Sequence, residues 1–220
     1  SDISSNYITY TLKIKPDDFF MFGSGFGDSD ADLTPVYEKV IDYEKARLDD
    51  EMIKMILIPA SSIKGAIAHR TTYHYNLKQK YFIGSEKAKE SIKELFGEAK
   101  NSKIDIDASK GKILISDCFK SNNNQTKTFD HVAIDRFTGG AIDGALFQEK
   151  TIADIREYEI DILLEKEIEY EYIEAFECAL KDITTGMLSL GGMTTKGHGV
   201  FSGKILKDSE LLNKEVCYGK

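Results

Sequence analysis

The alternation of apolar and polar side chains along residues 7–15 most constrains how this chain can fold. Ile8, Tyr10, Leu12 and Ile14 alternate with more polar neighbours. A period of two puts one set of side chains on one face, which predicts a half-buried strand. Three later segments are also predicted as strands, at residues 112–119, 157–167 and 199–207.

Helical patterns separate these strands. Residues 56–80 are predicted to begin extended, pass Pro59 and continue as a helix with Ser61 or Ser62 as its N-cap. Two further helices are predicted over residues 86–96 and 168–186, the second with one apolar face. Residues 36–55 carry mixed charge and are predicted to hold a short helix. Loops are expected at residues 21–35 and 121–130.

The order of these elements predicts an α+β fold. If insertions are ignored, the order is β-α-β-β-α-β, which is the ferredoxin-like (RRM-like) arrangement. That fold hosts many functions, so the motifs have to decide the function.

Composition excludes some classes of function. The net charge of −8 argues against a non-specific nucleic-acid coat, although a basic groove on an acidic body remains compatible with it. No apolar run approaches the roughly 20 residues of a membrane helix, and the first residues lack the apolar core of a signal peptide. Cys118, Cys178 and Cys217 lie far apart, so we expect reduced thiols in a cytoplasmic protein without a membrane partner.

A glycine-rich run, LGGMTTKGHGVFSG at residues 190–203, precedes the last predicted strand. Neither the P-loop pattern nor G-x-G-x-x-G occurs in it. Clustered glycines mark tight turns or a close approach of the backbone to a ligand. This run therefore predicts either a turn or a binding loop.

Four segments together resemble one family. They are IPASSIKGAI (58–67), KILISDCF (112–119), HVAIDRFTGGAIDGALFQEKTI (131–152) and the glycine-rich run. Their motifs and order resemble the RAMP superfamily, the RNA-binding backbone proteins of CRISPR effector complexes. The chain length resembles the repeated backbone subunit of type III complexes, the Cas-seven family. Ala60 and Ala68 depart from the family pattern, where glycine and arginine are usual, and Arg70 is a candidate substitute for the arginine.

The resemblance implies one RAMP domain over residues 1–220. Insertions are expected at about 17–55, a lid with an acidic catalytic-type loop, and at about 120–156, a thumb-like hairpin. It also implies guide (cr)RNA, a complementary target RNA, other CRISPR effector subunits and further copies of the chain as partners.

An RNA groove is predicted where the first helix meets the glycine-rich run. Helix amides and a positive helix end favour phosphate, so Ser61, Ser62 and Lys64 are candidate RNA contacts. From the glycine-rich run the candidates are the backbone of Gly191, Gly192 and Gly197, with Lys196 and His198. The alternative is structural: a serine caps the helix and the glycines only turn the chain.

Residues 131–152 resemble the family's thumb, a hairpin that presses between nucleotides. Arg136 would meet a phosphate or stack on a base, and Phe137 and Phe147 would act as apolar wedges. The alternative is an inert hairpin in which Asp135 and Arg136 pair with each other.

An acidic loop holds Asp28, Asp30 and Asp32. Active type III backbone subunits carry one aspartate ahead of a short stretch with proline, which Asp32 resembles. Its carboxylate would hold Mg²⁺ or Mn²⁺, or help to activate a ribose 2′-hydroxyl. An EF-hand is less suitable, because Leu33 and Lys39 occupy loop positions six and twelve. A solvated acidic loop is the third alternative.

The histidines offer a metal-free alternative. His69 and His74 are five apart, unlike the pair of a metalloprotease helix. His131 and His198 lie in family-like loops and are candidate RNA contacts. A metal-free nuclease would act through His198 or His74.

These observations predict a type III backbone subunit that binds guide RNA and cleaves paired target RNA through Asp32, with a divalent cation and no organic cofactor. One alternative is a catalytically inactive guide-RNA scaffold. The other is a ferredoxin-like enzyme that binds a nucleotide or phosphometabolite in the glycine-rich run.

Overall fold

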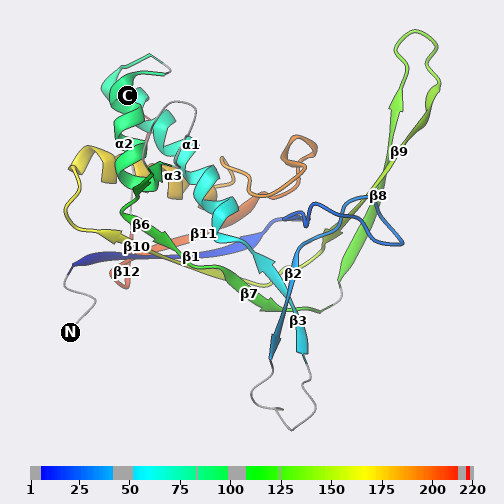
Figure 1. Cartoon of the computed structure of the whole chain (residues 1–220), viewed down its shortest axis with the longest axis horizontal. Helices are drawn as coiled ribbons and strands as arrows, with labels where there is room; N and C mark the ends of the chain where they lie inside the picture. Colours follow the sequence, from blue (N-terminus) through cyan, green and yellow to red (C-terminus); the bar gives the residue numbers. More distant parts are fainter. Residues whose placement is uncertain are drawn as a thin grey trace.

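The predicted α+β class is confirmed. The computed structural model describes residues 6–41, 52–82, 84–98, 108–123, 125–212 and 217–218. Within these ranges the chain forms three α-helices and mostly antiparallel sheets (Figure 1).

A five-stranded sheet forms the centre of the molecule, in the order β12-β11-β1-β10-β6. The strands are β1 (Tyr7–Pro16), β6 (Ile113–Ile115), β10 (Tyr158–Glu165), β11 (Phe201–Lys207) and β12 (Glu210–Leu211). Each neighbouring pair is antiparallel. Tyr10, Leu12 and Ile14 are buried, as the alternation predicts.

Three helices cover one face of this sheet (Figure 1). They are α1 (Ala60–Gln79), α2 (Glu86–Phe96) and α3 (Tyr170–Thr184). In α1 the buried residues Ile63, Ile67 and Thr71 recur every four positions, so one stripe faces the core. The sequential order β1, α1, β6, β10, α3, β11 and the sheet order are compatible with a ferredoxin-like core.

The helix predicted within residues 36–55 is wrong for the part that the structure describes. Residues 37–41 form β2 (Tyr37–Ile41) and residues 52–58 form β3 (Met52–Ile58), while residues 42–51 lie outside the described ranges. β2 pairs with β3, and β3 pairs with β7 (Cys118–Ser121). The strand predicted at 112–119 is therefore divided between β6 and β7, which join different sheets.

The capping role predicted for Ser61 and Ser62 is wrong. Pro59 is the N-cap of α1, and no side chain at that position caps the helix. Instead, the amide nitrogen of Ala60 donates to Oδ1 of Asp117 at 2.6 Å. The helix thus begins at a carboxylate that comes from the loop between β6 and β7.

The prediction of three reduced cysteines is also wrong. Cys178 of α3 and Cys217 form a disulfide, and Cys118 is free and buried. Burial raises the pKa of the Cys118 thiol. Since 39 residues separate the bonded pair, the spacing alone gave no sign of it.

Two strands form an extended hairpin, β8 (Thr126–Ile134) and β9 (Ala141–Ile152), which replaces the second half of the loop predicted at 121–130. His131 lies opposite Phe147 in its register. Figure 1 shows this hairpin projecting well beyond the central sheet. Two short strands, β4 (Gly97–Glu98) and β5 (Ser109–Lys110), and a 3-10 turn at Thr194–Lys196 complete the described elements.

The hairpin is fixed to the body at its last residues. Ile152 exchanges backbone hydrogen bonds with Phe20, at 2.9 and 3.2 Å. The buried carboxylate of Asp154 accepts from Arg156 at 2.6 Å and from the hydroxyl of Tyr158 at 2.7 Å. Among the described residues, no helix is long and apolar enough to span a membrane.

Candidate nucleic-acid interface

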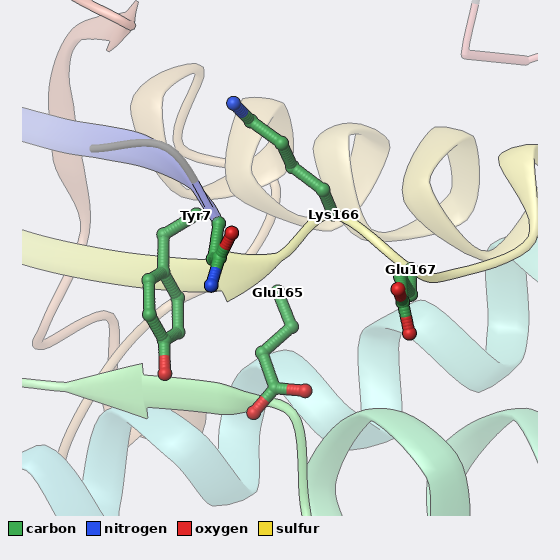
Figure 2. Close-up of a pocket in the computed structure, with 5 residues that line it drawn as sticks. Tyr7, Glu165, Lys166 and Glu167 are labelled. Atoms are coloured by element: carbon green, nitrogen blue, oxygen red, sulfur yellow. The ribbon is translucent and has the colours of Figure 1, made fainter. Parts of the chain in front are cut away.

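A hollow of about 530 Å³ lies at the start of β1 and contains none of the predicted site residues. It is lined by Asn6, Tyr7 and residues 165–167. Figure 2 shows the carboxylates of Glu165 and Glu167 on one side of the strand end and Lys166 on the other. Two carboxylates would repel phosphate, and the predicted loops follow the opposite end of β1, so this hollow is a poor candidate for the RNA site.

The aspartate loop, residues 22–36, follows the other end of β1 and runs along the hairpin. The backbone nitrogen of Asp32 donates to the carbonyl of Gln148 at 2.9 Å. In return, the backbone nitrogen of Gln148 donates to Oδ2 of Asp32 at 2.7 Å. Leu33 and Glu149 form a parallel β-bridge. The exposed side chain of Asp32 is therefore held against the edge of β9.

The other two carboxylates of this loop share ion pairs with one lysine. Lys150 Nζ lies 2.7 Å from Asp28 Oδ2 and 3.2 Å from Asp30 Oδ2. The hydrogen bond from Lys150 lowers the pKa of Asp28. For Asp30 the hydroxyl of Ser29 and then Lys150 lower the pKa. Asp32, by contrast, forms no ion pair with any described residue.

A protein-only metal site is not present among the described residues, since no three histidine, cysteine, aspartate or glutamate side chains are grouped to hold an ion. Asp32 offers one carboxylate whose Oδ2 already accepts from Gln148. A single carboxylate fits Mg²⁺ only when substrate phosphates and water complete the coordination shell.

A buried carboxylate follows Gln148 in β9, on the residue that forms the β-bridge with Leu33. Glu149 of β9 is fully buried. Its Oε2 lies 2.9 Å from His131 Nε2 and 3.7 Å from Lys196 Nζ, and its Oε1 lies 2.9 Å from His198 Nδ1. We call these four residues the Glu149 cluster. It joins β8, β9 and the glycine-rich run.

Aromatic rings and lysines surround this cluster. Phe129 lies next to the rings of His131 and His198, with centroids 6.5 and 5.1 Å away. Lys127 Nζ lies 4.9 Å from the centroid of Phe129, and Lys196 Nζ lies 6.0 Å from that of Phe147. Cations beside partly exposed rings are the features of surfaces that bind single-stranded RNA.

The glycine-rich run owes most of its glycines to the fold. Gly191 has φ of +90°, and a β-carbon there would overlap the carbonyl oxygen of Met21. The amide of Gly192 donates to Met21 O at 2.7 Å, and that of Gly197 donates to Thr194 O at 3.1 Å. These two amides are therefore not available to phosphates, and the run's remaining RNA candidates are Gly191, Lys196 and the largely buried His198.

The start of α1 presents Ser61 and Ser62 as exposed side chains and Lys64 as half-buried. Among the described residues, Lys64 forms no ion pair, and none of the three is hydrogen-bonded to the glycine-rich run. The carboxylate of Asp117 already accepts a hydrogen bond from the backbone amide of Ala60. The positive helix end is consequently shared with an anion of the protein itself.

Arg70 contacts α3 and Tyr218. Its Nε donates to Oδ2 of Asp182 at 2.5 Å, and Nη2 donates to the hydroxyl of Tyr218 at 2.8 Å. His74 Nε2 lies 2.7 Å from the same Oδ2 of Asp182. Burial lowers the pKa of His74, which favours the neutral ring. The predicted role of Arg70 in RNA binding has no support here, because its guanidinium joins α1 to α3 and the chain end.

The tip of the hairpin exposes the predicted wedge. Phe137 is 100% exposed. The carboxylate of Asp135 accepts from the backbone nitrogens of Phe137 at 2.7 Å and Thr138 at 3.3 Å. Asp135 thus forms the turn, and no ion pair with the exposed Arg136 is present in the described structure. The alternative in which these two residues pair is wrong.

Comparison with protein families gives a match over most of the chain. A sequence model described as the RAMP superfamily matches residues 47–202, more than two thirds of the chain. The chain belongs to the RAMP superfamily. A comparison with curated proteins finds no match. Membership makes this RAMP protein a CRISPR-associated RNA-binding subunit, and the family match includes the hairpin, the start of α1 and most of the glycine-rich run.

The sequence patterns indicate His131 and His198 but not Glu149, Lys127 and Phe129, which lie with them in this candidate interface. Lys127, Phe129 and His131 alternate with a period of two, which is the signal of a strand face. The polar residues that precede this strand make the segment resemble a loop, which masks the signal. Nothing in the sequence indicates that Glu149 is buried between two histidines.

Proposed function

We propose that this RAMP protein is a backbone subunit of a type III CRISPR effector complex that binds guide RNA and cleaves the paired target RNA through Asp32. The observation that carries the proposal is the contrast within the aspartate loop. Lys150 forms ion pairs with Asp28 and Asp30, whereas Asp32 forms no ion pair with a described residue and is fixed on β9 by the backbone of Gln148. A carboxylate held in this way suits chemistry at a phosphate.

The hairpin supports the RNA part of the proposal. Its tip holds a fully exposed phenylalanine, and the aromatic rings at its base lie beside Lys127 of β8 and Lys196 of the glycine-rich run. Such a strip would contact bases by stacking and phosphates by charge. The exposed side chains of Ser61 and Ser62, together with Lys64, would extend this contact along the guide RNA.

A divalent cation is part of the proposed reaction. Asp32 would hold Mg²⁺ or Mn²⁺ together with RNA phosphates, and the ion would neutralise charge that develops on the phosphate. Within the protein, the reciprocal backbone hydrogen bonds to Gln148 orient the carboxylate. We expect no tight metal binding in the absence of RNA, because the described residues supply one carboxylate at this position.

The test uses the complex assembled with its other subunits. We expect a guide RNA to co-purify in stoichiometric amount, and a complementary target to be cut in Mg²⁺ but not in EDTA. Asp32→Asn should keep RNA binding and cut on the order of 100-fold more slowly. Asp28→Asn is the matched control, since its carboxylate is paired with Lys150.

Each alternative has its own outcome in this experiment. A complex that holds guide RNA but never cuts identifies the catalytically inactive scaffold. A preparation free of RNA that retains a nucleotide or phosphometabolite identifies the ferredoxin-like enzyme. Wild-type cutting by Asp32→Asn together with an inactive Asp28→Asn would move the catalytic role within the loop.

A further inference from the structure

We infer that His131, positioned by Glu149, is a further catalytic residue of the proposed cleavage and removes the proton from the attacking ribose 2′-hydroxyl. This inference rests on the proposed function. It comes from the geometry of the Glu149 cluster, which pairs a buried carboxylate with a histidine that remains partly open to solvent.

The carboxylate of Glu149 is buried, whereas most glutamate side chains lie in solvent. The side chain of Glu149 is 0% exposed, and burial of an anion is costly unless it is paired. Its partners are His131, His198 and Lys196, of which only His131 and Lys196 keep substantial exposure, at 26% and 36% of the side chain. Both of these meet the same oxygen, Oε2.

The hydrogen bond to Glu149 selects the working nitrogen of His131. A neutral imidazole that donates from Nε2 to a carboxylate carries its lone pair on Nδ1. Glu149 therefore leaves Nδ1 as the basic atom and stabilises the imidazolium once the ring has taken a proton. The carboxylate of a hydrolytic triad does the same for its histidine.

An open surface lies in front of this ring. A shallow hollow of about 580 Å³ is lined by His131, Phe147 and Lys196, together with Asp130 and small residues of the hairpin. Phe147 offers a ring face for a base, and Lys196 offers a cation for the phosphate beside it. The hollow is open enough for an extended RNA strand to cross it.

Asp32 lies across β9 from His131. Its loop is paired to β9 at Gln148, and β9 is paired to β8, where His131 lies opposite Phe147. Neighbouring strands are about 4.8 Å apart, so the two backbones are separated by two such spacings, about 10 Å. Because β9 lies between the two backbones, the phosphodiester would cross the face of β9 to meet both side chains.

The proposed step is a transesterification within the RNA. The 2′-oxygen forms a bond to the adjacent phosphorus while His131 Nδ1 accepts the 2′-hydroxyl proton. The bond from phosphorus to the 5′-oxygen breaks, and water supplies the proton for the departing oxygen. The products are a 2′,3′-cyclic phosphate and a 5′-hydroxyl. Lys196 stabilises the extra negative charge on the phosphorane.

A purely structural role for His131 makes a different prediction. If the ring only tethers β8 to Glu149, a glutamine that donates from its own amide nitrogen replaces it without loss. If the ring takes a proton, glutamine keeps the tether and loses the base. His131→Gln therefore separates the two roles, and His69→Gln on the exposed side of α1 is the matched control.

The experiment measures single-turnover cleavage in the assembled complex with saturating target. We expect His131→Gln to bind guide and target RNA like the native protein and to cut about 100-fold or more slowly. We expect added imidazole to restore part of the rate in His131→Ala and none in Asp32→Asn. If His131→Gln lowers the melting temperature, imidazole rescue of His131→Ala distinguishes loss of the base from loss of stability.

The pH profile gives a second readout. The charged and titratable groups around His131 are Glu149, Asp130, Lys196 and His198. We expect the native rate to rise with pH along an acidic limb that His131→Gln lacks, at equal RNA occupancy. A structural tether would leave the shape of this limb unchanged.

The outcomes distinguish this inference from the proposed function. Wild-type cutting by His131→Gln, with Asp32→Asn inactive, overturns the role of His131 and leaves the proposed function intact. A native complex that never cuts overturns both. Products with a 3′-hydroxyl and a 5′-phosphate would exclude attack by the 2′-oxygen, and with it the role of His131.

Discussion

Asp117 caps the helix that begins at Ala60, through a hydrogen bond of 2.6 Å from the amide nitrogen of Ala60 to Oδ1 of Asp117. The two residues are 57 positions apart, and Asp117 follows β6 of the central sheet. The contact fixes the start of α1 relative to this sheet. It also places a negative charge at the helix end that the proposed function assigns to guide RNA.

The first prediction separates these two effects of Asp117. Asp117→Asn keeps an oxygen acceptor for Ala60 and removes the charge, so we expect RNA to bind about two- to fivefold more tightly at low salt. Asp117→Ala removes the acceptor too, and should lower the free energy of unfolding by about 1 kcal/mol. Titration of RNA and urea unfolding measure the two effects. Asp161→Asn, on the sheet face turned away from the helices, should change neither.

The central sheet was predictable from the sequence, because alternation along β1 and β10 is long enough to define a buried face. The hairpin β2–β3 was not, since its described residues carry mixed charge and show no clean period. Its strands are stabilised by pairing with each other and with β7, which is a tertiary effect.

The candidate site was predictable only in part. Asp32, Lys196 and Phe137 stay predictions that depend on the resemblance of their segments to family motifs. The capping by Asp117 and the pairing of Cys178 with Cys217 bring together residues far apart in the chain, and no local pattern reports such contacts. The same is true of Arg70, whose partner Asp182 is 112 residues away.

Asp182 gives a prediction about pH. Burial alone would raise the pKa of Asp182, but hydrogen bonds from Tyr218, Arg70 and His74 outweigh burial and lower it. A carboxyl with a lowered folded-state pKa stabilises the protein above its unfolded pKa of about 3.9 and loses this contribution as the pH falls through the folded value. We therefore expect the free energy of unfolding to decline below about pH 4.

Asp182→Asn tests this assignment. At pH 7 the free energy of unfolding of the variant should be lower by about 3 kcal/mol, since the partly buried guanidinium of Arg70 loses its anion. Its stability should also depend less on pH below about 4 than that of the native protein. Urea unfolding at several pH values gives both quantities. If the free energy of unfolding falls as steeply with acid in Asp182→Asn as in the native protein, the decline comes from other carboxyls.

Two lysines of the proposed RNA surface, Lys64 and Lys196, should contribute to the salt dependence of RNA binding. Lys64→Ala combined with Lys196→Ala removes two cations, and each phosphate contact on a single strand contributes about 0.7 to the slope of log affinity against log salt. We expect the slope to become shallower by about 1.4 and the affinity to fall. Lys89→Ala with Lys93→Ala on α2 is the control of equal charge, and its lysines already pair with Glu86 and Glu98. Equal slopes in the two double variants would show that Lys64 and Lys196 do not contact RNA phosphates.

The last prediction concerns Phe137 at the tip of the hairpin. Because its side chain is 100% exposed and touches no core residue, Phe137→Ala should change the free energy of unfolding by less than about 0.5 kcal/mol. Stacking of one base on an aromatic ring contributes about 1 to 3 kcal/mol, so target binding should weaken by roughly five- to 150-fold if the ring wedges between nucleotides. Asp135→Ala should have a related effect by another route, since it removes the acceptor that shapes the turn around Phe137. Thermal melting, target affinity and the ladder of cut products are measured together on guide-loaded complexes. Unchanged affinity and an unchanged ladder in Phe137→Ala would show that the exposed ring does not contact RNA, whatever the hairpin does elsewhere.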